Sequence, residues 1–377
     1  MMSGRSCSKW GKKSKRVKRF FSEFGFRLNI GAAILLFLAY LAPFVPPDYF
    51  WPLAFFGLAY PYLLILNLLF LLFWIFFRSK RILLPLVSIL LGGVNIINTY
   101  QLIPSSGTKA QGINVLSYNV HGFKFDQRAH RTDNPGILGY FKSTGAEIIC
   151  LQEGLQFQMK KLTPQGIKEA LPEINYFHFA TDSNYSDLIT LSKFPIINKG
   201  EIKFSGRAVL VIFSDIQINN RRIIRVYNCH LQSYSIDPDD YSSIDSIGSV
   251  SNSRQIAEAR KISYKLRAGF RLRAFQARRL ADHMLQSPYP VVVCGDFNDT
   301  PVSYVYRKVR GNLKDAFVES GFGTSNTYNG VLPSFRIDYI LANQNFELEN
   351  YRRDLVQFSD HFPVRCRLIP KGSPITK

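Results

Sequence analysis

Polar residues that could perform chemistry lie within or near the ends of short apolar runs at several points along the chain. They are Asn119, Glu153, His230, Asp296, Asn298, Asp338, Asp360 and His361. Carboxylate and amide oxygens suit one hard divalent cation, which prefers oxygen ligands and retains water molecules. Clustered Cys/His spacing of the zinc type is absent from the sequence. Such a set suits phosphoester hydrolysis, in which a metal neutralises phosphate oxygens, a carboxylate aligns or deprotonates water, and histidines stabilise developing charge.

Each of these residues also has a structural interpretation when it is taken alone. Asn119 could close a turn, Glu153 could cap a helix, and His230 could be a structural histidine. Asp338 lies inside an apolar run, where an unpaired carboxylate is costly, so we expect a partner for it. A buried acid beside an imidazole would fix the tautomer of the ring and raise its basicity.

The order of the motifs resembles the endonuclease/exonuclease/phosphatase superfamily over Ile113 to Leu368. The matching segments are Asn119, Gln152-Glu153, His230-Leu231, Gly295-Asp296-Phe297-Asn298, Arg336-Ile337-Asp338-Tyr339 and Ser359-Asp360-His361. This resemblance implies an α/β fold, a four-layer sandwich of two mixed β-sheets flanked by helices. An N-terminal helical membrane anchor would precede it.

The resemblance also implies a metal site. Glu153 would be the main ligand of a Mg²⁺ ion, for which Mn²⁺ can substitute, and Asn119 and Asp360 would lie near the same ion.

The remaining motif residues would be catalytic. Asp296 would orient or activate the attacking water, and Asn298 would hold both the phosphate and Asp296. His361, oriented by Asp338, would stabilise the transition state, and His230 would bind the phosphate from the other side. Whether Asp296 or a histidine takes the proton stays open.

We therefore expect a membrane-anchored, metal-dependent hydrolase of phosphoester bonds, a phosphodiesterase or phosphatase acting on lipid headgroups or related phosphoesters. One alternative is an extracytoplasmic endonuclease acting on DNA or RNA, and another is a catalytically inactive binding module. The segment Tyr227–Leu231 departs from the Tyr-x-Pro-Asn motif of abasic-site endonucleases, which disfavours DNA repair. Residues 233–273 look like an insertion. The basic helix expected over 254–285 could face an anionic substrate, bilayer headgroups or solvent.

The 377 residues divide into two parts of different character. The net charge of +20 excludes an acidic protein, and the 46% of hydrophobic residues excludes a disordered chain. Nearly uncharged apolar stretches at 28–47, 50–77 and 82–100 are each close to the roughly 20 residues that span a bilayer. We expect three transmembrane helices, with two as the alternative, after a basic cytoplasmic segment 1–27. A linker at 101–112 and a catalytic domain at 113–370 would follow.

Basic residues predict the orientation of these helices. The basic N-terminus and the segment Arg78–Arg81 should both be cytoplasmic, because Lys and Arg are retained on that side. With three spans, the chain is a multi-pass integral membrane protein whose catalytic domain lies outside the cytoplasm. The expected partners are the lipid bilayer and a phosphoester substrate, and no protein partner is evident.

Short β-branched runs predict the strands of the domain. They are at 113–118, 146–151, 188–191, 209–216, 222–229, 291–294, 336–341 and 364–368. Four of the five cysteines, Cys150, Cys229, Cys294 and Cys366, lie in such runs and should be buried thiols.

Overall fold

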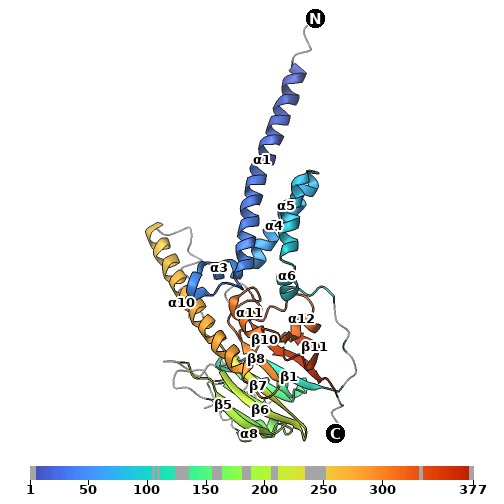
Figure 1. The fold of residues 1–377 in the computed structure, drawn as a ribbon, viewed down its shortest axis with the longest axis vertical. Helices are drawn as coiled ribbons and strands as arrows, with labels where there is room; N and C mark the ends of the chain where they lie inside the picture. The colour runs from blue at the N-terminus through green and yellow to red at the C-terminus, as the bar shows by residue number, and fades with distance from the viewer. Residues whose placement is uncertain are drawn as a thin grey trace.

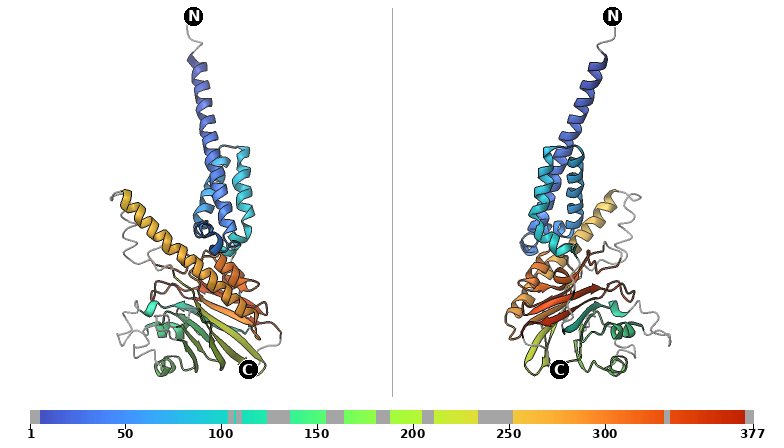
Figure 2. Two further views of the ribbon diagram at one scale, coloured as in Figure 1. Left: turned by 60° about the vertical axis from the view of Figure 1, so that its left-hand side comes forward. Right: turned by 90° about the vertical axis from the view of Figure 1, so that its right-hand side faces the viewer.

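A column of helices stands on a domain built from two β-sheets (Figures 1 and 2). The computed structural model describes residues 6–103, 107, 111–123, 136–154, 164–180, 188–204, 211–233, 252–330 and 334–372. Residues 234–251 of the expected insertion and much of the expected linker lie outside the described residues, whereas 252–273 are helical.

The helical column contains six helices and one 3-10 turn in the described part of the chain. They are α1 (Ser6–Leu41), α2 (Pro47–Phe50), α3 (Pro52–Leu58), α4 (Tyr60–Phe76), η1 (Lys80–Ile82), α5 (Leu83–Leu91) and α6 (Gly93–Thr99). Within α1, Ser22–Leu41 is long and apolar enough to cross a membrane. Two further candidates are pairs of helices that are bent at a break. The bend is 64° between α3 and α4, and 59° between the segment Lys80–Leu91 and α6. The number of membrane spans reaches three only if each bent pair is one span.

Proline and glycine explain these two breaks. Pro61 lies in the first turn of α4, where a helix tolerates the missing N–H, so a new helix begins there. Gly92 separates α5 from α6. The sequence predicts one helix over 50–77 and another over 82–100, and the structure divides each into shorter helices.

Two mixed sheets form the domain, as the resemblance implies. The first has the order β11-β12-β1-β2-β4-β3 and the second the order β5-β6-β7-β8-β10-β9. The strands are β1 (Ile113–Asn119), β2 (Ile148–Gln152), β3 (Tyr176–Ala180), β4 (Leu188–Ser192), β5 (Ile196–Glu201), β6 (Val211–Asn219), β7 (Arg222–His230), β8 (Val291–Asp296), β9 (Lys314–Asp315), β10 (Asp338–Ala342), β11 (Phe346–Arg353) and β12 (Val364–Pro370). Among these described strands the parallel pairs are β1–β2 and β7–β8.

Helices flank the sheets, and the largest of them is α10 (Asn252–Leu285), which rises beside the helical column (Figure 1). The others are η2 (His121–Phe123), α7 (Gly136–Thr144), α8 (Pro164–Ala170), α11 (Tyr304–Arg310) and α12 (Ala316–Ser320). The basic face expected on α10 is only partly solvated. Arg273 is fully buried, whereas Arg271 and Arg279 are exposed.

The main core lies between the two sheets. Val115, Ile148 and Val364 of the first sheet pack against Val226 and Ile340 of the second, so burial of these apolar side chains holds the sheets face to face. Three cysteines belong to this core and a fourth to a neighbouring cluster, which confirms the expected buried thiols: Cys150, Cys294, Cys366 and Cys229.

The helical column and the domain share a buried junction. The Arg336 guanidinium donates to the Asn98 carbonyl at the end of α6 (2.7 Å) and to Asp315 Oδ2 (2.9 Å). Val302 of the domain packs in a cluster with α1 and α4 side chains. A Cβ on Gly57 of α3 would lie 2.3 Å from the Val302 carbonyl oxygen, so only glycine permits this approach. The domain is therefore docked against the column.

We expect Arg336→Met to destabilise the protein by about 3–5 kcal/mol, because it leaves Asp315 buried without its cation. The measurement is thermal or denaturant unfolding of the full chain in detergent. Arg352, exposed on β11, supplies the control variant Arg352→Met, which should change stability little. Equal melting temperatures for the two variants would contradict the role of the buried ion pair.

Candidate functional site

The candidate residues meet at one edge of the two sheets because of the strand directions. The parallel pairs β1–β2 and β7–β8 place Asn119 beside Gln152, and His230 beside Asp296, at their carboxyl ends. The antiparallel strand β10 starts at the same edge and sets Asp338 opposite Asp296. Residues distant in sequence are therefore brought together by backbone pairing alone.

Gly295 allows the backbone of β8 to pass close to β7 just before Asp296. Its φ is +144°, and a Cβ there would lie 1.9 Å from the Cys229 carbonyl oxygen. A side chain at this position would force β8 away from β7, so the glycine permits the pairing that carries Asp296 and His230.

Glu153 leaves β2 with a positive φ of 55°, which turns its carboxylate into the site. Asn119 Nδ2 donates to Glu153 Oε1 at 3.0 Å. Burial acts to raise the pKa of Glu153, but the hydrogen bond from His121 and the charge of His230 outweigh it and hold that pKa well below its usual range. Glu153 is therefore an ionised carboxylate, as a metal ligand must be.

His121 is a site residue that the sequence analysis missed. Its Nδ1 lies 3.5 Å from Glu153 Oε2 and 3.4 Å from Asp360 Oδ1, so the two carboxylates converge on one point. Its backbone has a φ of 45°, a conformation that is common at functional sites, but the sequence alone gives no sign of it.

These residues fit a divalent cation. Two carboxylates that converge on one nitrogen offer oxygen ligands and an excess of negative charge to an ion in the same region. Asn119 fits less directly, because its Oδ1 accepts from the His121 backbone N–H and its Nδ2 faces Glu153. Asn119 could bind the ion only if its side-chain amide rotated, so that the oxygen rather than the nitrogen faced Glu153.

Asp296 is fixed by Asn298. The Asn298 backbone N–H donates to Asp296 Oδ1 (2.7 Å), and Asn298 Nδ2 donates to Asp296 Oδ2 (3.2 Å) and to the Leu231 carbonyl (2.9 Å). Burial raises the pKa of Asp296 to about 6, and the nearby charge of Asp338 adds to this effect. The carboxylate is rigidly held and at the border of ionisation near neutral pH.

Asp338 and His361 form a hydrogen-bonded pair, with Asp338 Oδ2 2.9 Å from His361 Nδ1. Burial acts to lower the pKa of His361, but the charges of Asp338 and Asp296 outweigh it and raise the pKa to about 10. His361 Nε2 lies 3.8 Å from Asp296 Oδ2. The ring is thus an oriented cation beside the Asp296 carboxylate.

A second group of side chains could also hold a metal ion. Among the described residues, the possible ligand atoms of Asp296, Asp338 and His361 lie within 4.8 Å of one another. One Asp338 oxygen and one His361 nitrogen of this trio are already joined by a hydrogen bond, which leaves fewer of its atoms open to an ion. The carboxylates of Glu153 and Asp360, which both approach His121 Nδ1, offer a separate set of oxygen ligands at the same edge.

His230 is the clearest sign that the site binds a ligand. The ring is about 9% exposed, and neither of its nitrogens has a hydrogen-bond partner in the described structure. Its Nε2 lies 3.4 Å from Glu153 Oε1 and 3.9 Å from Asp296 Oδ2. Because buried polar atoms are normally hydrogen-bonded, this ring is suited to a partner supplied by the substrate.

One further residue, Arg273, supports the segments that carry the site. Arg273 of α10 contacts Asp299 Oδ2 at 3.3 Å and donates to the Gln232 carbonyl at 2.8 Å, so α10 is tied to the segments that follow His230 and Asn298. From the sequence, Arg273 belongs to the basic face of the helix. Only its tertiary contacts show that the side chain is buried.

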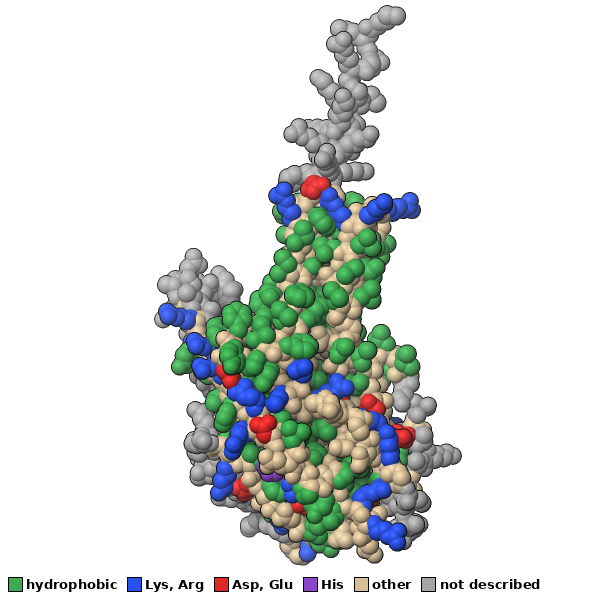
Figure 3. Space-filling view, in the orientation of Figure 1, with side chains coloured by type: hydrophobic (Ala, Val, Ile, Leu, Met, Phe, Trp, Pro, Cys, Tyr) green, Lys and Arg blue, Asp and Glu red, His purple; other side chains and the backbone are tan. Residues whose placement is uncertain are grey.

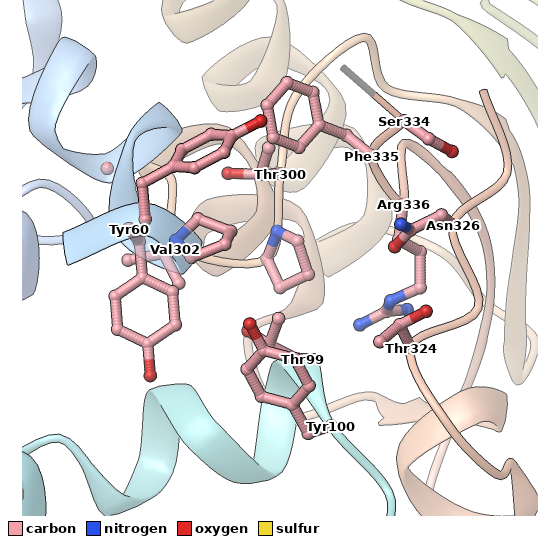
Figure 4. A pocket seen from close by; sticks show the side chains of 14 residues that line it. Tyr60, Thr99, Tyr100, Thr300, Val302, Thr324, Asn326, Ser334, Phe335 and Arg336 are labelled. Atoms are coloured by element: carbon pink, nitrogen blue, oxygen red, sulfur yellow. The ribbon is translucent and has the colours of Figure 1, made fainter. Parts of the chain in front are cut away.

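A cavity of about 180 Å³ lies behind this segment, at the junction with the helical column (Figure 4). Tyr60 and Tyr100 line it from the column, and Thr300 and Arg336 from the domain. None of the eight predicted site residues lines this cavity. It belongs to the junction, whereas the carboxylates and imidazoles gather at the sheet edge.

Two stacked mixed sheets, with carboxylates and imidazoles gathered at one edge, form an α/β sandwich of the phosphoesterase type. Residues 116–361 match the model of the endonuclease/exonuclease/phosphatase family, and the chain belongs to that family. Residues 18–100 match a second model, described as a domain of unknown function (DUF8431). No curated protein matches the chain.

Several solved structures resemble the domain. A 3′-5′ exonuclease (NExo) from Neisseria meningitidis has 15% identity and a TM-score of 0.48, covering 68% of this chain and 100% of its own. A mannosyl-6-phosphatase from Bacteroides thetaiotaomicron has 16% identity and a TM-score of 0.43, covering 68% and 99%. Truncated TDP2 from Caenorhabditis elegans has 15% identity and a TM-score of 0.44, covering 68% and 97%.

We expect Glu153→Gln to weaken Mg²⁺ or Mn²⁺ binding ~10-fold or more, because it removes the charge of the main proposed ligand. The measurement is isothermal titration of the purified full chain with each metal. Glu173→Gln is the control, since Glu173 is exposed and its carboxylate contacts Lys193, which lies beside the start of β2, whereas Glu153 follows the end of that strand. Unchanged metal affinity in the Glu153 variant, with an intact melting curve, would refute the assignment.

Proposed function

We propose that the chain is a membrane-anchored, divalent-metal-dependent hydrolase of phosphoester bonds. The observation that carries this proposal is the buried His230 ring, whose nitrogens make no hydrogen bond although Nε2 lies within ion-pair distance of Glu153 and Asp296. An anionic phosphoryl group would supply the missing partner. Residues 113–370 would be the catalytic domain, and 1–112 the cytoplasmic segment, the membrane helices and the linker.

Glu153 and Asp360 would hold a Mg²⁺ ion, with Asn119 near it, and Mn²⁺ could substitute. When bound, the ion would neutralise phosphate oxygens that the two carboxylates would otherwise repel. His121 contacts both carboxylates and would orient them.

Asp296 would orient or activate the attacking water, since both of its oxygens accept hydrogen bonds from Asn298 and its position is fixed. His361, held by Asp338, would place positive charge beside the phosphoryl group as negative charge develops. His230 would bind the phosphoryl oxygens from the opposite side. Each role uses an atom that the sheet edge already positions.

The membrane arrangement is supported by the surface of the helical column. Figure 3 shows hydrophobic side chains over most of the column and Lys and Arg side chains at its far end. The turn between α4 and α5 contributes Arg78, Lys80 and Arg81 to this end. If each bent helix pair is one span, the basic end is cytoplasmic and the catalytic domain lies on the opposite side of the membrane.

We favour lipid headgroups or related phosphoesters as substrates, because the domain is docked directly on the column and would be held close to the bilayer. An extracytoplasmic nuclease is the second candidate. The exposed Arg271, Tyr264 and Phe275 of α10 favour it, since aromatic and basic side chains in one row can contact a nucleic-acid strand.

The test is a hydrolysis screen of the full chain in detergent with Mg²⁺ against phospholipids, DNA, RNA and phosphate monoesters. Activity on one substrate class, lost with EDTA and restored with Mg²⁺ or Mn²⁺, is the expected result. Absence of hydrolysis with every class would leave the catalytically inactive binding module as the better description.

We expect Asp296→Asn and His361→Ala each to lower kcat by about 10²-fold or more, because each removes a group that would act on the transition state. The double variant should be little worse than either, since groups that act as a unit lose rate non-additively. Asp338→Asn should be milder than His361→Ala, because it disturbs only the orientation of the ring. An Asp338 variant that is worse, with an unchanged melting curve, contradicts that pairing.

We expect an alkaline-phosphatase fusion after Lys377 to be active in cells and a green-fluorescent-protein fusion there to be dark. Three spans with the N-terminal basic residues in the cytoplasm place the domain outside. The enzymatic and fluorescence signals are normalised to the amount of fusion protein. A bright fluorescent fusion with an inactive phosphatase would show an even number of spans and overturn the extracytoplasmic location.

A further inference from the structure

A second cleft lies at the junction of the helical column and the domain. Its volume is about 740 Å³. The column contributes the end of α1 and the break between α5 and α6, and the domain contributes α11 with the turn that follows it. None of the eight predicted site residues lines this cleft, so it is separate from the candidate active site.

The domain wall of the cleft carries uncompensated positive charge. Arg307 and Arg310 line it, and no acidic side chain is among the described residues that do so. Arg310 is held in place by the Asn98 side chain (2.6 Å) and the Leu313 carbonyl (3.3 Å), both neutral groups. Arg307 is exposed and lies 4.3 Å from the centre of the Phe44 ring. Two guanidinium groups beside each other without a carboxylate favour an anion.

The column wall of the same cleft carries exposed apolar side chains beside the polar Asn95 and Asn98. Phe44, Leu91 and Val94 have exposed fractions of 60%, 70% and 71%. They lie where α1 and α5 end above the domain, next to the two arginines. Exposed apolar side chains beside a cationic wall match the two halves of a phospholipid, whose acyl chains and phosphate headgroup need opposite environments.

We propose that this cleft binds the headgroup of an anionic phospholipid, with the phosphate between Arg307 and Arg310 and the acyl chains along Phe44, Leu91 and Val94. The proposal rests on the membrane insertion of the column and not on the catalytic activity. Such a lipid would bridge the column and the domain, since the cleft has one wall from each.

The test uses the purified full chain in dodecyl maltoside, titrated with dioleoyl phosphatidylglycerol or dioleoyl phosphatidylcholine. Lipid adducts in native mass spectra and the shift in melting temperature are measured. We expect phosphatidylglycerol to bind more tightly and Arg307→Gln to weaken it about tenfold, the effect of losing one charged hydrogen bond. Lys308→Gln is the matched control, because Lys308 lies on α11 but does not line the cleft.

A second variant addresses the apolar wall. Val94→Gln keeps both arginines and changes an exposed side chain, so the protein should fold normally and yet bind phosphatidylglycerol more weakly. Equal affinity for the two lipids, full binding by Arg307→Gln, or equal loss in Lys308→Gln overturns the proposal. Millimolar inorganic phosphate that reproduces the whole melting shift also overturns it, since the cleft would then take a free anion.

Carbonate extraction of membranes separates this proposal from the one it rests on. If the chain stays in the membrane pellet but binds the two lipids with equal affinity, only the proposed lipid site is wrong. If the chain appears in the supernatant, both the membrane insertion and the lipid site are wrong. The hydrolysis screen reports on the catalytic assignment independently of both.

Discussion

The buried guanidinium of Arg336 joins three parts of the molecule that the sequence keeps apart. It pairs with Asp315 beside α12, donates to the last turn of α6, and lies over the Phe317 and Tyr339 rings at 4.6 Å each. The final carbonyls of a helix lack intrahelical partners, so a buried helix end needs such a donor. Arg336 precedes Asp338 by two residues. The contact that docks the column therefore also fixes the strand that orients the His361 ring.

Much of the sheet edge could be predicted from sequence, because its polar residues include three that end buried runs, one that follows a run and one that begins a run: Asn119, His230, Asp296, Glu153 and Asp338. The runs ending at Asn119, His230 and Asp296 are almost wholly buried in the structure. Strands without this pattern were missed. The residues of β5 are largely exposed, and β11 has a register shift between Glu349 and Arg352 that interrupts its alternation. Local periodicity reveals a strand only where one face is continuously buried.

Contacts between distant segments explain what the sequence did not show. His121 joins the site because Asp360, at the other end of the domain, meets it across the sheet edge. Arg273 becomes internal because α10 packs on the segment that contains Asp299. Neither fact follows from spacing along the chain. The divided helices are different, since Pro61 and Gly92 are local signals that a simple count of apolar residues overlooks.

The helical column is more than a tether, because it packs against the segment that follows the proposed catalytic residues Asp296 and Asn298. Asn298 fixes Asp296, and four residues later Val302 lies in the apolar cluster of the column. Pro301, between them, lines both junction cavities. A flexible linker would leave this segment exposed to water, whereas the observed docking buries it against α1, α3 and α4. Because packed interfaces resist continuous deformation, the geometry at Asp296 and the position of the column are set together.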